Sequence, residues 1–150
     1  MNEQDTVDYY FFDEQKFKKE VTAGNILEHT FVPGRGVYYG TYRLDLEKKL
    51  EEGRNIIVNP DVVGARYYKK NYNATTIFIK TPSIENLKER LVSRDKNISE
   101  EELTQRLKAA AYELEHEEDF YDYVVVNADN KLEEAVNQVA EILEKEMYRL

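Results

Sequence analysis

The segment ILEHTFVPGRGVYYGT, residues 26–41, decides how the first part of this chain folds. Residues 26–32 alternate loosely between apolar and polar side chains, which favours a β-strand. Residues 33–36 contain the proline and the two glycines of a turn, and residues 37–39 return as a second strand. The segment therefore predicts a small lobe built on a β-hairpin.

Helices are predicted on both sides of this hairpin. Asp13 is a suitable N-cap for a helix that runs to about Ala23, and Gly24 is a suitable C-terminal stop. A second helix is predicted over residues 42–52. Ahead of the first helix, the aromatic run at residues 8–12 favours a short strand.

From residue 55 onward, short apolar runs alternate with longer amphipathic segments. Strands are predicted at residues 55–58, 75–79 and 123–126, and helices at residues 62–71, 83–94, 99–119 and 130–148, the last three capped by Ser83, Ser99 and Asn130. Strands that alternate with helices are typical of an α/β layer with a parallel sheet.

Composition excludes several classes of protein. The net charge of −9 argues against binding to a nucleic-acid backbone, which needs clustered Lys and Arg. The absence of cysteine excludes disulfides, thiolate catalysis and cysteine-ligated zinc, and the two histidines are too isolated to suggest a metal site. No apolar run is long enough for a membrane span or a secretory signal, so we expect no membrane partner and a cytoplasmic location.

Glu28 and Thr41 offer the groups that a guanine base requires. Guanine presents two N–H donors and one carbonyl acceptor on its pairing edge; a carboxylate can accept from both donors, and a hydroxyl can donate to the carbonyl. Tyrosine hydroxyls near residue 39 could hold a phosphate. The simpler interpretation is that Glu28 is a solvated strand residue and that Tyr38 and Tyr39 pack in the hairpin, one ring on each face.

No Gly-x-x-x-x-Gly-Lys-Ser/Thr stretch occurs in these 150 residues. This stretch is the usual backbone cradle for a donor triphosphate. The residues are therefore better equipped to hold an acceptor nucleotide than to hold ATP.

An ordered set of short matches makes the chain resemble guanylate kinase from the GMP-binding lobe of that family to its C-terminus. The matching residues are Asp8-Tyr9-Tyr10-Phe11, Phe17, Ala23-Gly24, Glu28, Tyr38-Tyr39-Gly40-Thr41, Gly53, Asp61, Gly64-Ala65, Pro82-Ser83, Arg90-Leu91, Arg94, Arg106-Leu107 and Tyr121-Asp122-Tyr123-Val124-Val125-Val126-Asn127. The resemblance implies an α/β, three-layer parallel-sheet nucleoside-monophosphate kinase-like core without the first strand and the phosphate loop. It further implies one domain over residues 1–150, with a GMP-binding lobe at 8–41 and a partial core at 42–150 whose helical lid lies at about 90–106.

The resemblance also implies roles for individual residues. Glu28 would accept from the guanine N1 and N2 hydrogens, and Thr41 would contact O6. Tyr9 and Tyr39 would hold the GMP phosphate, and Asp61 would lie near the guanine.

The same resemblance makes Arg90, Arg94 and Arg106 the lid arginines that neutralise the transferring phosphoryl group. ATP as co-substrate and Mg²⁺ are implied by the family only. The alternative for these arginines is surface pairing with Glu89, Glu101 and Glu102.

Some positions depart from the family pattern. Asn59-Pro60-Asp61-Val62-Val63-Gly64 lacks one acid and one amide of the family segment, which puts the positioning of metal-bound water in doubt. In the lid turn, Asp95 could pair with Arg94 and compete with phosphate. Arg35, in the turn of the hairpin, adds a cation.

Three functions follow from these observations. The first is a guanylate kinase relative that binds GMP but is weak or inactive as this chain alone, because the phosphate loop is absent. On this hypothesis the sheet lacks a strand between residues 56–58 and 75–79, so the isolated chain would be marginally stable, repacked, or completed by another chain or a second copy. The second is a catalytically silent guanylate-kinase-like module that binds a protein or phosphopeptide, and the third is an acidic structural domain without a nucleotide.

Overall fold

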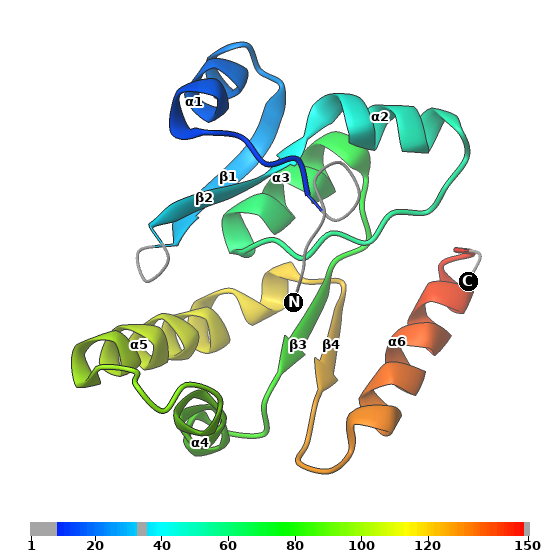
Figure 1. Ribbon diagram of the computed structural model, residues 1–150. Coiled ribbons are helices and arrows are strands. Elements are labelled where there is room, and N and C mark those ends of the chain that lie inside the picture. The colour runs from blue at the N-terminus through cyan, green and yellow to red at the C-terminus, as the bar shows by residue number, and fades with distance from the viewer. Residues whose placement is uncertain (1–8, 33–35, 149–150) are drawn as a thin grey trace. The chain divides into compact units, whose positions relative to one another are not determined.

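The computed structural model describes residues 9–32 and 36–148, and the chain divides into two units, Met1–Gly64 and Ala65–Leu150. In chain order the elements are α1 (Glu14–Thr22), β1 (Ile26–Val32), β2 (Val37–Tyr42), α2 (Arg43–Glu51), α3 (Val62–Tyr72), β3 (Ile77–Lys80), α4 (Ile84–Arg94), α5 (Glu100–His116), the short 3₁₀ helix η1 (Glu118–Phe120), β4 (Tyr123–Val126) and α6 (Leu132–Lys145) (Figure 1). The predicted division into a lobe, a core and a lid stays a prediction.

The predicted hairpin of the first unit is confirmed. Strands β1 and β2 pair antiparallel, with Thr30 opposite Tyr39 and a register irregularity between Ile26 and His29. Strand β2 continues to Tyr42, three residues beyond the predicted end, and so includes Thr41. The predicted turn at residues 33–36, including Arg35, lies largely outside the described residues.

Helix α1 begins and ends where the sequence predicts. The Asp13 carboxylate accepts from the backbone N–H of Lys16 at 2.7 Å, and Gly24 follows the helix with φ +71°, a conformation that favours glycine. On the inner side of α1, the buried Phe17 stacks on Tyr38 of β2 with ring centroids 5.3 Å apart. Tyr38 therefore has the packing role that the simpler interpretation gave it.

Two predicted strands of the first unit are wrong. Residues 55–58 are described but form no strand, and Ile57 is 81% exposed. In the aromatic run at residues 8–12, of which Asp8 is not described, Tyr9 forms only an isolated bridge. The rings of this run are held by aromatic packing instead, as between Tyr10 and Tyr42, whose centroids are 5.2 Å apart.

The second unit contains a parallel sheet. Strands β3 and β4 pair directly, with Ile79 opposite Val125, and α6 packs along β4 (Figure 1). Val125 is only 1% exposed and is the most deeply buried large side chain described. Strands β3 and β4 confirm two of the three predicted core strands. The predictions of marginal stability and of completion by another chain stay predictions.

Asp122 joins the start of this sheet to α3. Its Oδ2 accepts from the backbone N–H and the hydroxyl of Thr76 at 2.9 and 2.8 Å, and its Oδ1 accepts from Lys69 Nζ at 2.7 Å. Partial desolvation opposes ionisation of Asp122, but these hydrogen bonds outweigh it and hold the pKa of the carboxyl below its ordinary value. The ionised carboxylate therefore stabilises the fold.

The helix caps of the second unit are mostly as predicted. Ser83 and Ser99 accept from the backbone N–H groups of Asn86 and Glu102. The prediction that Asn130 caps the last helix is wrong: Asn130 has φ +58°, and the cap position belongs to Lys131. A left-handed residue cannot supply the extended backbone that an N-cap needs.

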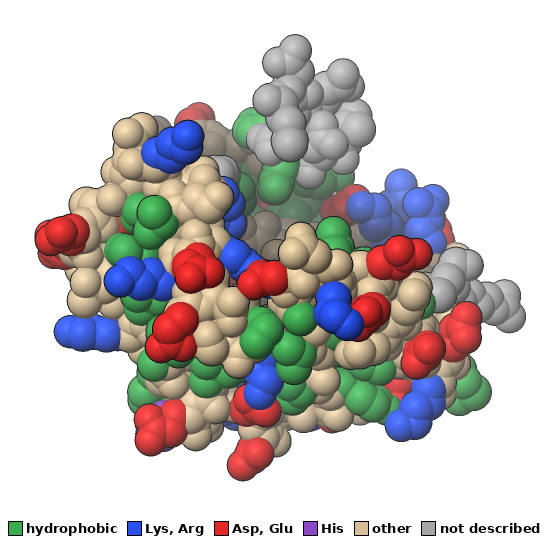
Figure 2. Space-filling view, turned by 90° about the horizontal axis from the view of Figure 1, so that it is seen from below, with side chains coloured by type: hydrophobic (Ala, Val, Ile, Leu, Met, Phe, Trp, Pro, Cys, Tyr) green, Lys and Arg blue, Asp and Glu red, His purple; other side chains and the backbone are tan. Residues whose placement is uncertain are grey.

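On the face drawn in Figure 2, acidic, basic and hydrophobic side chains are interspersed. In the part of the chain that the structure describes, no helix is both long and apolar enough to cross a membrane.

Candidate functional site

Glu28 and Thr41 meet across the hairpin of the first unit. Thr41 Oγ1 donates to Glu28 Oε1 at 2.7 Å, and both side chains are partly buried. The close approach of the strands depends on Gly40, because a Cβ at this position would lie 2.6 Å from the Glu28 carbonyl oxygen. The two residues predicted to recognise guanine thus share one side of the hairpin.

A cavity of about 740 Å³ opens beside this pair. Its lining includes Glu28, Thr41, Tyr9 and Tyr39, so four of the five residues predicted to bind GMP border one space. The rings of Tyr9 and Tyr39 meet edge to face with centroids 5.9 Å apart. The volume lies within the range of small-molecule sites.

The polar groups of the cavity include a further cluster. The hydroxyl of Tyr10 donates to Asp45 Oδ1 at 3.2 Å, and Lys49 Nζ donates to Asp45 Oδ2 at 2.6 Å. Burial and the neighbouring Asp45 carboxylate raise the pKa of the Tyr10 hydroxyl. Lys49 is the cation among the described residues of the lining, and it is engaged by Asp45.

Asp61, the fifth predicted residue, is not part of the cavity lining but lies at the start of α3. Its Oδ1 accepts from the backbone N–H of Gly64 at 2.9 Å, as an N-cap does, and its Oδ2 accepts from Thr30 Oγ1 at 2.6 Å. Desolvation opposes ionisation, but the hydrogen bonds from Thr30, Gly64 and Val63 outweigh it and lower the pKa of Asp61.

Gly64 connects Asp61 to Glu28. A Cβ on Gly64 would lie 2.6 Å from the Cβ of Pro60 and 3.4 Å from Glu28 Oε2. A side chain at this position would therefore clash with Pro60 and make an ordinary van der Waals contact with the Glu28 carboxylate. Sequence reasoning did not single out Thr30 or Gly64 as site residues, although Thr30 stands two positions from Glu28 and so belongs to the same strand face.

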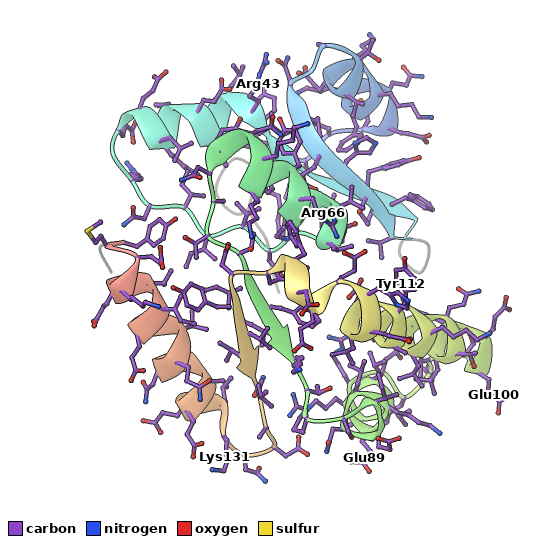
Figure 3. All side chains as sticks on the ribbon, turned by 180° about the vertical axis from the view of Figure 1, so that it is seen from behind. Arg43, Arg66, Glu89, Glu100, Tyr112 and Lys131 are labelled. Carbon is purple, nitrogen blue, oxygen red and sulfur yellow. The ribbon has the colours of Figure 1, made fainter. Side chains whose placement is uncertain are left out.

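The three predicted catalytic arginines belong to the second unit. Arg90 donates twice to Asp129 Oδ1, at 2.5 and 3.0 Å, and once to the carbonyl of Asn127 at 2.8 Å. Its neighbour Glu89 on α4, labelled in Figure 3, was the predicted alternative partner. Asp129 also accepts from Asn86. Arg90 therefore ties α4 to the loop after β4.

Arg94 and Arg106 are more exposed than Arg90. Arg94 is the last residue of α4 and makes no side-chain hydrogen bond or ion pair with the described residues. Arg106 pairs with Glu102 one turn away at 2.6 Å, which is one of the surface pairs named as an alternative. An exposed pair of this kind contributes only about 0.3–0.5 kcal/mol, so it is easily exchanged for another anion.

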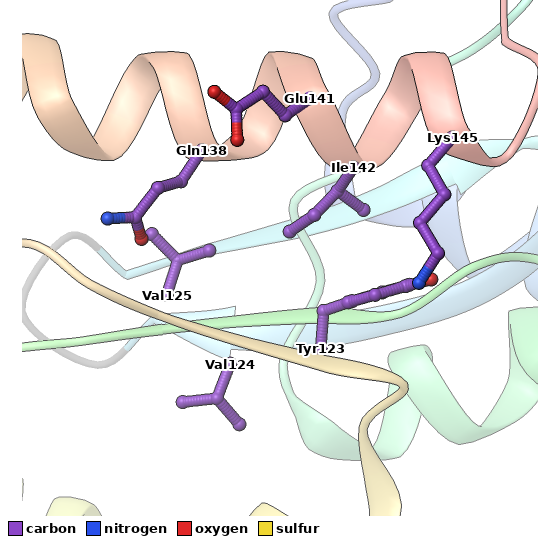
Figure 4. A pocket seen from close by; sticks show the side chains of 7 residues that line it. All are labelled: Tyr123, Val124, Val125, Gln138, Glu141, Ile142 and Lys145. Atoms are coloured by element: carbon purple, nitrogen blue, oxygen red, sulfur yellow. The ribbon is translucent and has the colours of Figure 1, made fainter.

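A second, smaller hollow of about 300 Å³ lies between β4 and α6. Figure 4 shows Val125, Ile142 and Tyr123 along it, with Lys145 beside the Tyr123 ring. None of the residues predicted to have a function lines this hollow. Nor do the described residues contain a group of three acidic or imidazole side chains that could hold a metal ion.

Comparisons with known proteins all indicate the same family. The family model described as guanylate kinase matches residues 1–146. The chain is 38% identical over 151 residues to the guanylate kinase of Clostridium perfringens, covering 100% of this chain and 67% of that protein. It is 38% identical over 146 residues to the guanylate kinase of Thermotoga maritima, covering 97% of this chain and 68% of that protein.

A solved structure supports the same family. The crystal structure of guanylate kinase from Anaplasma phagocytophilum superposes with a TM-score of 0.73 at 31% identity, covering 99% of this chain and 70% of that one. The predicted mixed α/β fold is thereby confirmed.

Proposed function

Because the chain belongs to the guanylate kinase family, we propose that its first unit binds GMP and that the site serves phosphoryl transfer from ATP to GMP. The observation that carries this proposal is the contact of Thr41 with Glu28 at 2.7 Å on the wall of a cavity shared with Tyr9 and Tyr39. A carboxylate and a hydroxyl so placed complement the pairing edge of guanine.

Binding of the base requires an exchange of hydrogen bonds. A threonine hydroxyl has one proton to donate, and without nucleotide this proton is given to Glu28 Oε1. When guanine enters, its N1–H and N2–H donate to the Glu28 carboxylate, and the Thr41 hydroxyl turns to donate to O6. Each polar group in the partly buried site then keeps a partner, whereas adenine would leave Glu28 facing an acceptor nitrogen at N1.

The phosphate of GMP is assigned to the hydroxyls of Tyr9 and Tyr39, whose rings pack together beside the same cavity. The lining offers little positive charge, because its described cation, Lys49, is neutralised by Asp45. The proposal therefore assigns charge neutralisation in the transition state to arginines of the second unit. Arg94 and Arg106 suit this role better than Arg90, which Asp129 and a carbonyl already engage.

Mg²⁺ accompanies ATP in the chemistry that the family implies. The described side chains do not fit a resident metal site, since no group of three potential ligands gathers among them. We therefore derive no step through a metal ion from these residues.

We also infer that these 150 residues, assayed alone, transfer phosphate slowly. They contain no glycine-rich stretch whose backbone N–H groups and lysine could hold the donor phosphates. A coupled assay with ATP, Mg²⁺ and GMP measures the rate. A turnover of about 1–100 s⁻¹, the ordinary range for kinases, would contradict this inference.

Calorimetric titration with GMP and AMP tests the proposed substrate. We expect GMP to bind at least tenfold more tightly than AMP, and Glu28→Ala to weaken GMP binding about tenfold to a hundredfold, because hydrogen bonds to a charged group are lost. Glu51→Ala, which removes an exposed carboxylate at the end of α2, is the matched control and should bind GMP as the wild type does. Equal affinity of the wild type for GMP and AMP would overturn the guanine assignment.

A further inference from the structure

The aromatic segment at residues 9–12 contains Tyr9, one of the two residues assigned to the GMP phosphate. These residues are described but form no strand apart from the isolated bridge at Tyr9, which is 45% exposed. The ring of Tyr9 contacts the rings of Phe11 and Tyr39, with centroids 6.0 and 5.9 Å apart. Because ring contacts impose no hydrogen-bond geometry, the place of the Tyr9 hydroxyl depends on how the neighbouring residues of the segment are held.

Tyr10 and Phe12 have a different aromatic partner. Their rings pack on Tyr42, the last residue of β2, with centroids 5.2 and 5.7 Å away. Tyr42 directly follows Thr41, one of the two residues assigned to the base. The segment is therefore attached through Tyr10 and Phe12 to the end of the strand that carries the base-binding hydroxyl.

Tyr10 also has a polar anchor on α2. Its hydroxyl donates to Asp45 Oδ1 at 3.2 Å, a contact between residues 35 positions apart in the sequence. Lys49, one turn further along α2, donates to Asp45 Oδ2 at 2.6 Å and so fixes the orientation of the carboxylate. Burial and the Asp45 carboxylate raise the pKa of the Tyr10 hydroxyl, which therefore keeps its proton and remains a donor at neutral pH.

We propose that Tyr10 is a positioning residue: its hydrogen bond to Asp45 holds the aromatic segment on α2 and so places the Tyr9 hydroxyl where the phosphate of GMP binds. This inference rests on the proposed GMP site. Tyr10 and Tyr9 are adjacent, and all three side chains border the same cavity. Asp45 itself is unsuited to contact a phosphate, because both groups are negative and its two oxygens already accept from Tyr10 and Lys49.

The positioning role differs from a merely structural one in what it does to binding. If the hydrogen bond only stabilised the first unit, its loss would lower the free energy of unfolding and would treat all ligands of the cavity alike. If it positions Tyr9, its loss weakens binding of the phosphate and leaves binding of the base unchanged. Guanosine, which is GMP without the phosphate, separates the two cases.

Tyr10→Phe removes the hydroxyl and keeps the ring that packs on Tyr42. Tyr38→Phe is the matched control, since it makes the same change in another ring of the cavity lining, one that stacks on Phe17. Calorimetry would measure the affinities for GMP and guanosine of the wild type, Tyr10→Phe, Tyr9→Phe, the double variant of these two and the control. The four chains without the control form a double-mutant cycle.

We expect Tyr10→Phe to weaken GMP binding about three- to tenfold and to leave guanosine binding unchanged, while Tyr38→Phe keeps wild-type values. In the Tyr9→Phe background the change at Tyr10 should have no further effect on GMP, because no hydroxyl is left to position. An unchanged GMP affinity in Tyr10→Phe, equal losses for GMP and guanosine, or effects of Tyr9 and Tyr10 that simply add would each overturn the positioning role.

A failure of the proposed function gives a different result. If the wild type binds GMP no more tightly than guanosine, the assignment of the phosphate to the tyrosines fails, and the role of Tyr10 fails with it. If the wild type prefers GMP and Tyr10→Phe keeps the whole of that preference, the phosphate site stands and the positioning role alone is overturned.

Discussion

Gly64→Ala is a substitution for which helix propensity and steric fit predict opposite signs. Alanine favours a helix interior over glycine by about 0.8–1.0 kcal/mol. Against this gain, the added Cβ would lie 2.6 Å from the Cβ of Pro60, on a ring that cannot rotate away, and 3.4 Å from Glu28 Oε2. Overpacking of this kind costs about 1–3 kcal/mol. We expect a net destabilisation of about 1 kcal/mol, because the clash with Pro60 outweighs the gain in helix propensity.

Urea unfolding of four chains separates these contributions: wild type, Gly64→Ala, Pro60→Gly and the double variant. If the clash with Pro60 is the cause, its cost of about 2 kcal/mol disappears in the Pro60→Gly background, and the double variant should be about 2 kcal/mol more stable than the sum of the single effects predicts. Gly24→Ala is the control, since a Cβ there meets nothing within 4 Å and its cost comes only from the positive φ. A Gly64→Ala chain more stable than wild type, or strictly additive effects, would refute the steric reasoning.

Three further outcomes follow from the contacts described above. Asp122→Asn should lower the free energy of unfolding at pH 7, because hydrogen bonds depress the pKa of Asp122 in the folded chain despite desolvation. The difference in free energy of unfolding between wild type and variant should shrink as the pH falls below about 4, where the carboxyl becomes protonated. Urea unfolding at pH 7 and at pH 3 would measure both values. Arg90→Ala should cost about 1–3 kcal/mol of stability, because Arg90 donates to both Asp129 and the carbonyl of Asn127. Arg106→Ala should cost less than about 0.5 kcal/mol, because Arg106 makes only an exposed pair with Glu102. Equal thermal midpoints for the two variants would contradict this reasoning. Tyr39→Phe should weaken binding of GMP about fivefold while leaving that of guanosine unchanged, which competition calorimetry can measure.

Much of the local structure could be predicted from the sequence because its signals are local. The hairpin and the cap at Asp13 depend on residues within a few positions of one another. Residues 55–58 were predicted wrongly because an apolar run does not reveal whether a partner strand is present to complete its hydrogen bonds. The cap at Asn130 was predicted one residue too early, since its residue type suits both an N-cap and a left-handed turn.

The candidate site was predictable in part for a related reason. Glu28 and Thr41 lie on consecutive strands, so the hairpin itself brings them together. The contact between Thr30 and Asp61 joins segments far apart in the sequence, and no local sequence pattern predicts it. The engagement of Arg90 by Asp129, rather than by the adjacent Glu89, likewise depends on how α4 packs in its own unit.

A crystal structure of this chain with GMP would test the central claim most directly. We expect the pairing edge of guanine to lie in the cavity of the first unit, with N1 and N2 within about 3 Å of the Glu28 carboxylate and O6 within the same distance of Thr41 Oγ1. In that complex the Thr41 hydroxyl would no longer donate to Glu28. A base bound outside this cavity, or one whose pairing edge faces away from both side chains, would contradict the account.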